Sequence, residues 1–147
     1  MPKSPLYLVP SRKALTTGRF IVAATHLFAP RLTTRAFRLT ADGTPAIAYA
    51  RMFAIRNAAL GLGLLRLDSF TRPQQFLAVN IVMDAVDAAA FLAAGLRRDV
   101  SRTSTALSTA VALSAVLAGT AALIEHKQAA AERTAPTATA PSNSDRR

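Results

Sequence analysis

The chain has 147 residues, a length that fits one domain, and it contains no cysteine, which excludes disulfide bonds, thiol nucleophiles and thiolate metal sites. Hydrophobic residues make up 51% and charged residues 18%, which is more apolar than an ordinary soluble domain. The net charge of +10 comes from 18 Lys+Arg against 8 Asp+Glu, and the basic residues lie at the margins of apolar segments. This distribution suits lipid headgroups better than a nucleic-acid groove. We therefore expect the lipid bilayer as partner and no nucleic acid.

The first apolar segment is residues 14–30, ALTTGRFIVAATHLFAP, after a proline-containing lead-in. It is short for a membrane span of about 20 residues, it contains Arg19, and it ends at Pro30. A cleaved signal peptide is the alternative, but no A-x-A site follows the apolar run. We expect an uncleaved helix, which would let Arg19 reach the headgroups if it began near Arg12. The basic segment 31–45 follows as a loop that includes a short surface helix.

Three further spans are expected at residues 46–65, 75–96 and 103–124. A 20-residue helix is about 30 Å long, the thickness of the hydrocarbon core. The short loop 66–74 makes the second and third spans antiparallel neighbours, and the uncharged fourth span carries the small residues that pack helices in lipid. The prediction is an all-α, four-helix transmembrane bundle over residues 1–127. Residues 128–147 form a low-complexity tail that is disordered beyond a helical extension to about Thr134.

Charged and amide side chains interrupt the second and third spans. The polar cluster predicted from them comprises Arg51, Arg56, Asn57, Asn80, Asp84 and Asp87. An isolated charge at the bilayer centre costs about 2.5–3.5 kcal/mol on insertion scales, and pairing lowers that cost. In an antiparallel hairpin Arg56 and Asp84 lie at equal depth. We therefore expect an Arg56–Asp84 pair with an Arg51–Asp87 pair beside it.

These pairs have three interpretations. The first is a structural clamp between the second and third helices, and the second is a polar cavity for an ion or a ligand. The third is catalysis, including Mg²⁺ binding by the D-x-x-D of Asp84 and Asp87. Mg²⁺ sites of that kind need more oxygen ligands than one such motif supplies, and no other predicted span carries an acid. We predict no metal, no cofactor and no catalytic residue.

The segments GRFIVAATHLFAP, ARMFAIRNAALGLGLL and NIVMDAVDAAAF together resemble a group of small, uncharacterised four-helix integral membrane proteins of GC-rich bacteria. The resemblance covers roughly residues 14–124. The positions that carry it are Arg51, Arg56, Asn57, Gly61 and Asp84. It implies a four-helix membrane architecture and no known activity, and Asn57 stands where an acid is common in that group.

The sequence therefore favours a multi-pass protein of the cell membrane with both termini in the cytoplasm. Its expected role is that of a non-enzymatic structural or interaction subunit, whose partner is a second copy or another membrane protein. The alternative is a small oligomeric transporter, or an ion- or proton-coupled carrier, that uses the polar face of the third helix. A soluble helical bundle is the structural alternative, although apolar runs of this length are hard to bury in so small a domain.

Overall fold

The computed structural model describes residues 11–134, and all regular structure within this range is helical. In chain order the elements are α1 (Ser11–Phe28), α2 (Pro30–Ala36), α3 (Ala46–Leu65), the 3-10 helix η2 (Leu67–Ser69), α4 (Pro73–Leu96) and α5 (Arg102–Thr134). The predicted all-α class is confirmed, and the predicted second span coincides with α3. The final helix continues past residue 124 to Thr134. The rest of the predicted tail lies outside the described residues.

Local residue chemistry explains where the helices begin and end. Pro30 and Pro73 lie in the first turns of α2 and α4, where a missing backbone N–H costs nothing. At the start of α5 the hydroxyl of Ser101 accepts a hydrogen bond of 3.1 Å from the backbone N–H of Ser104, which is an N-cap. At the end of α4, Arg98 adopts a left-handed φ of 65° that turns the chain toward α5.

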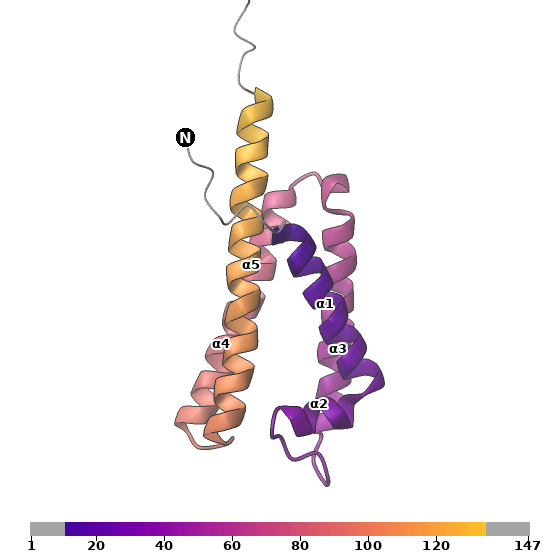
Figure 1. The fold of residues 1–147 in the computed structure, drawn as a ribbon, viewed down its shortest axis with the longest axis vertical. Helices are drawn as coiled ribbons and strands as arrows, with labels where there is room; N and C mark the ends of the chain where they lie inside the picture. The colour runs from indigo at the N-terminus through magenta and orange to yellow at the C-terminus, as the bar shows by residue number, and fades with distance from the viewer. Residues whose placement is uncertain (1–10, 135–147) are drawn as a thin grey trace, which may run out of the picture.

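The four long helices run in alternating directions and form two pairs, as Figure 1 shows. Helix α1 packs along α3, helix α4 packs along α5, and α1 also contacts α5. The backbones of α3 and α4 stay apart over most of their length. The predicted second and third spans are antiparallel, but the expectation that they pack as neighbours is wrong, because each packs along another helix.

Small residues explain the observed pairing. A Cβ added to Gly61 of α3 would lie 3.3 Å from the Cβ of Arg19 in α1, so glycine there permits the close approach of these two helices. A Cβ added to Gly119 of α5 would lie 2.9 Å from the side chain of Ile81 in α4. Each pair thus has a contact point that a larger residue would crowd.

By length and hydropathy, α4 and α5 could each cross a membrane. Helices α1 and α3 are not apolar enough to be candidate spans by the same criterion. Their basic residues lower the mean hydropathy: Arg51 and Arg56 in α3, and Arg12, Lys13 and Arg19 in α1. The fold is therefore helical with two candidate spans.

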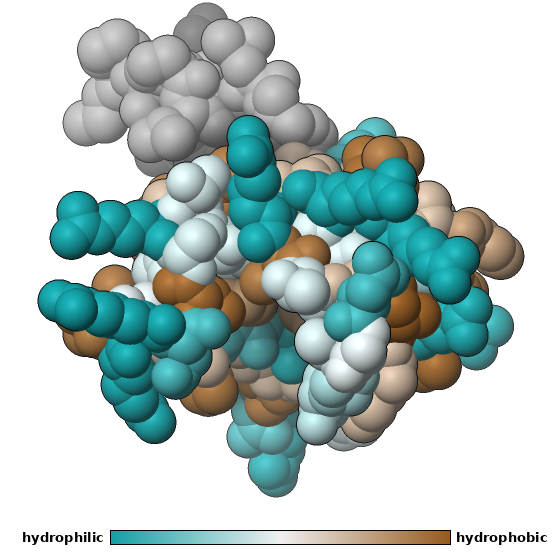
Figure 2. Space-filling model, turned by 90° about the horizontal axis from the view of Figure 1, so that it is seen from below, coloured by the Kyte–Doolittle hydropathy of each residue, from teal (hydrophilic) through white to brown (hydrophobic). Residues whose placement is uncertain are grey.

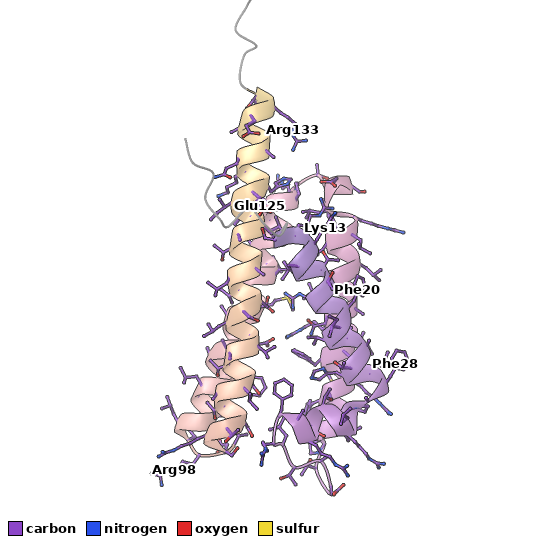
Figure 3. The ribbon with its side chains drawn as sticks, viewed as in Figure 1. Lys13, Phe20, Phe28, Arg98, Glu125 and Arg133 are labelled. Carbon is purple, nitrogen blue, oxygen red and sulfur yellow. The ribbon has the colours of Figure 1, made fainter. Side chains whose placement is uncertain are left out.

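The interior has three levels along the long axis. The upper end in Figure 1, near η2, holds an apolar core of Leu15, Leu64, Leu67, Leu77 and Ala122. Buried polar side chains occupy the middle, and a cavity extends toward α2 at the lower end. Charged side chains flank both ends. Figure 3 labels Lys13, Glu125 and Arg133 at the upper end and Arg98 at the lower end.

Candidate functional site

The centre of the molecule is an ion pair between Arg19 of α1 and Asp84 of α4. The two terminal nitrogens of Arg19 donate to the two carboxylate oxygens of Asp84 at 2.9 and 2.6 Å, a bidentate arrangement. The same nitrogens donate to the amide oxygens of Asn57 in α3 at 2.8 Å and Asn80 in α4 at 3.1 Å. One guanidinium therefore joins three helices. We call Arg19, Asn57, Asn80 and Asp84 the Arg19 cluster.

All four side chains of the Arg19 cluster are buried. Arg19 is 4% exposed, Asp84 3%, Asn57 2% and Asn80 0%. Each asparagine donates its amide N–H to the backbone carbonyl one turn earlier, Asn57 to Phe53 at 2.9 Å and Asn80 to Phe76 at 3.0 Å. These bonds turn both amide oxygens toward Arg19. A buried charge that is paired and hydrogen-bonded in this way avoids most of its desolvation cost.

A second ion pair lies beside the cluster, between Arg56 of α3 and Asp87 of α4. Both terminal nitrogens of Arg56 contact the Asp87 carboxylate, one of them at 3.1 Å. The pair is partly exposed, and the Arg56 guanidinium also lies 4.8 Å from the centre of the Phe53 ring. Arg56 and Asp87 thus connect the two helix pairs where the backbones of α3 and α4 do not touch.

The predicted partners were therefore wrong in detail. The carboxylate of Asp84 pairs with Arg19 and not with Arg56, and Asp87 pairs with Arg56 and not with Arg51. Asn57 is the residue of α3 that faces α1, so its neighbour Arg56 is rotated by about 100° toward Asp87, one helical turn below Asp84. Arg51 is exposed and lies outside the cluster. The other five predicted residues all take part in the Arg19 cluster or in the pair beside it.

Arg19 is the residue that the sequence reasoning missed as a member of the site. The helix begins at Ser11, before the predicted start at residue 14, yet Arg19 points inward instead of reaching the headgroups. A signal was present in the sequence, because Arg19 was the one charge within the apolar part of its segment while another segment held two aspartates.

A third ion pair, between Arg12 and Asp68, lies at the upper end of the molecule. Arg12 donates to the carboxylate of Asp68 at 2.9 Å and to the backbone carbonyl of Leu64 at 3.1 and 3.0 Å. It therefore satisfies a free carbonyl at the C-terminus of α3, where a cation is favoured. The hydrogen bond and positive charge of Arg12 hold the pKa of Asp68 below its ordinary value.

A cavity of about 710 Å³ lies between the two helix pairs, beside and below the Arg19 cluster. Its lining is mostly apolar and includes Phe37, Phe53 and Phe91. Arg19, Asn57, Asp84 and Asp87 line it as well, and His26 stands 5.3 Å from the ring centre of Phe53. Ala14 and Leu15 of α1 also line it, so the cavity extends beside the Arg19 cluster as far as the apolar core.

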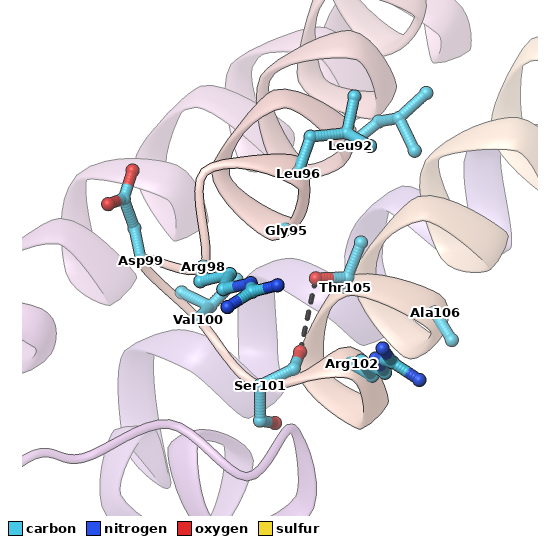
Figure 4. A pocket seen from close by; sticks show the side chains of 10 residues that line it. All are labelled: Leu92, Gly95, Leu96, Arg98, Asp99, Val100, Ser101, Arg102, Thr105 and Ala106. Carbon is cyan, nitrogen blue, oxygen red and sulfur yellow. Dashed lines mark hydrogen bonds between the residues drawn. The ribbon is translucent and has the colours of Figure 1, made fainter.

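A second hollow of about 740 Å³ lies at the turn between α4 and α5 (Figure 4). It is shallow, and within it the Thr105 hydroxyl donates to the Ser101 carbonyl at 3.1 Å. The buried charges do not reach it. The cavity below Arg19 is therefore the stronger candidate site.

The lower end of the molecule is basic. Its exposed arginines are Arg31, Arg35, Arg38, Arg97, Arg98 and Arg102. Figure 2 looks at this end and shows hydrophilic side chains projecting around its edge, with apolar side chains between them. Such an edge suits a boundary between water and lipid headgroups.

No protein-family model, curated protein or solved structure matches this chain.

Proposed function

We propose that the chain is a multi-pass integral membrane protein in which α1, α3, α4 and α5 all span the bilayer, and in which the Arg19 cluster clamps them together. The observation that carries the proposal is the distribution of side chains. Charged and amide groups occupy the middle of the interior, while large apolar side chains face outward on every long helix. Among the latter are Ile21 (59% exposed), Ile55 (63%), Val82 (60%) and Leu117 (72%).

This distribution is the reverse of what water favours. A water-soluble domain hides its large apolar side chains and rarely buries an arginine or an aspartate. In a bilayer the outward apolar side chains meet lipid, and the charges turn inward to find partners. The bilayer also accounts for α1 and α3, because their charges at mid-depth are paired with those of α4 and need not meet hydrocarbon.

The proposed role is that of a non-enzymatic structural or interaction subunit, which offers its outward helix faces to lipid, to a second copy or to another membrane protein. Its even number of spans places both termini in one compartment, which we propose is the cytoplasm. The cavity favours a second candidate, a small carrier, since it lies between the two helix pairs and has Arg19, Asn57 and Asp84 in its lining.

Extraction and reporter fusions test the proposed function. The full chain should remain in membranes after washing at alkaline pH and should dissolve in detergent. A reporter fused before Met1 and one fused after Arg147 should then report the same compartment. Release by alkaline washing would overturn the membrane assignment, and opposite compartments would mean an odd number of spans.

A further inference from the structure

The cavity between the helix pairs has the size and lining of a small-molecule site. Its volume of about 710 Å³ lies within the roughly 300–1,000 Å³ typical of such sites. Residues from α1, α2, α3, α4 and α5 all line it. Aromatic and aliphatic side chains dominate its walls, and a few polar groups lie at defined places.

Two buried polar groups at this cavity have no hydrogen-bond partner among residues 11–134. They are the Nε of Arg19 and the hydroxyl of Ser108, on side chains that are 4% and 5% exposed. A buried donor without an acceptor is costly, and such groups are normally satisfied. Both residues line the cavity, but the two atoms are themselves covered, so an acceptor within the cavity satisfies them only after their side chains turn toward it.

The charges around the cavity argue for a neutral occupant. Arg19 and Asp84 neutralise each other, and Asp87 is paired with Arg56. An anion would meet two carboxylates in a low-dielectric space, and a cation would have to compete with Arg19 for Asp84. The neutral form of His26 leaves this balance of charges unchanged. Its Nδ1 lies 2.9 Å from the Val22 carbonyl, which can only accept, so Nδ1 carries the proton and Nε2 remains an acceptor.

We propose that this cavity binds a neutral, elongated apolar molecule that carries a hydrogen-bond acceptor, of the class of fatty-acyl esters, with the ester carbonyl directed at Arg19. The apolar body lies against Phe37, Phe53 and Phe91 and extends toward α2. The inference rests on the proposed membrane location, because a bilayer is where such a molecule is abundant.

Photo-crosslinking of the purified full chain in detergent tests this inference. The probe is the methyl ester of a diazirine-bearing octadecenoic acid, compared with its free acid and with the amine of the same chain. The ester should label the cavity residues Phe91, Ser108 and Ala112, as mapped by peptide mass spectrometry, and unlabelled methyl oleate should compete. Labelling by the acid and the ammonium probe should be at least about tenfold weaker, since an unpaired buried charge costs more than one factor of ten.

Matched variants separate the cavity from the outer surface. Ala112→Leu fills part of the cavity and should reduce labelling by the ester about tenfold. Ala110→Leu makes the same change at an exposed position of α5 that does not line the cavity, and it should leave labelling unchanged. Ala115→Leu is a second filling variant, to be used if Ala112→Leu does not fold.

Three outcomes would overturn the inference. Labelling confined to outward residues such as Leu113 and Leu117 would mean that the probe reports only the detergent-facing surface. Stronger labelling by the free acid would mean that the arginines of the lower end select an anionic lipid. If an octadecene probe, which has no acceptor, labelled the cavity as strongly as the ester, a hydrogen bond from Arg19 would not contribute to binding. Retention in alkali-washed membranes is measured separately, so failure of the membrane assignment is distinguishable from failure of the binding site.

Discussion

The guanidinium of Arg19 and the carboxylate of Asp84 form a bidentate ion pair at 2.9 and 2.6 Å between helices that belong to different pairs. The amide oxygens of Asn57 and Asn80 complete the environment of the arginine. Removing either charge would leave the other buried without compensation.

A double-mutant cycle on Arg19 and Asp84 should therefore show strong coupling. Arg19→Gln and Asp84→Asn should each lower the free energy of unfolding by about 3–5 kcal/mol, the cost typical of breaking a buried pair, and less where water reaches the site. The double variant should cost much less than the sum of the two. Thermal unfolding in detergent measures all four proteins. As control, a cycle on Arg56 and Asp84, the pair expected from depth alone, should show the smaller coupling, and a larger one there would contradict the observed geometry.

The sequence was sufficient to predict the positions of the helices, but not to predict which charged side chains pair with one another. Apolar run lengths and the prolines at residues 45 and 73 located α3 and α4 closely. The predicted ion pairs came from matching the depths of charged residues within one hairpin of two helices. The Arg19 cluster, however, is formed by residues of three helices. The inward rotation of Asn57 depends on how α1 packs against Gly61, a contact distant in sequence that no local pattern encodes.

The close approach at Gly61 leads to a second prediction. Gly61→Leu would push against Phe20 and Arg19, whose side chains lie 3.2 and 3.3 Å from the added Cβ. Overpacking of this kind costs about 1–3 kcal/mol, and it should also loosen the Arg19 cluster. Gly18→Leu is the control, since a Cβ there meets nothing within 4 Å. Its stability should be equal or slightly higher, because leucine is a better helix former than glycine. Equal loss in the two variants would show that α1 and α3 do not approach at Gly61.

The upper ion pair gives a prediction about pH. The pKa of Asp68 is lowered in the folded state by its hydrogen bond to Arg12 and by the charge of Arg12. The stabilisation by this pair is thus fully present above the ordinary pKa of an aspartate, and it is lost as the pH falls through the lower folded-state value. The difference in Tm between the native chain and Asp68→Asn should be small, since the pair is exposed, and should vanish in acid.

Low ionic strength is required for that comparison, because salt screens exposed charges. Asp42→Asn serves as control, since it removes an exposed carboxylate at the opposite end of the molecule. A difference in Tm for Asp68→Asn that persisted at the lowest pH would mean that Asp68 acts through something other than its charge.

Accessibility of single cysteines tests the central claim of four membrane spans most directly, and the chain offers a cysteine-free background. Cysteines are placed at the outward mid-helix positions Ile21, Ile55, Val82 and Leu117, and at the exposed end positions Asp42, Ser69 and Asp99. A membrane-impermeant maleimide is then added to intact cells and to inverted vesicles. With four spans, Asp42→Cys and Asp99→Cys should react from one side and Ser69→Cys from the other, while all four mid-helix cysteines should react only after denaturation. Reaction of the mid-helix cysteines at Ile21 or Ile55 in the native membrane would contradict four spans, and reaction at all four would contradict a membrane protein altogether.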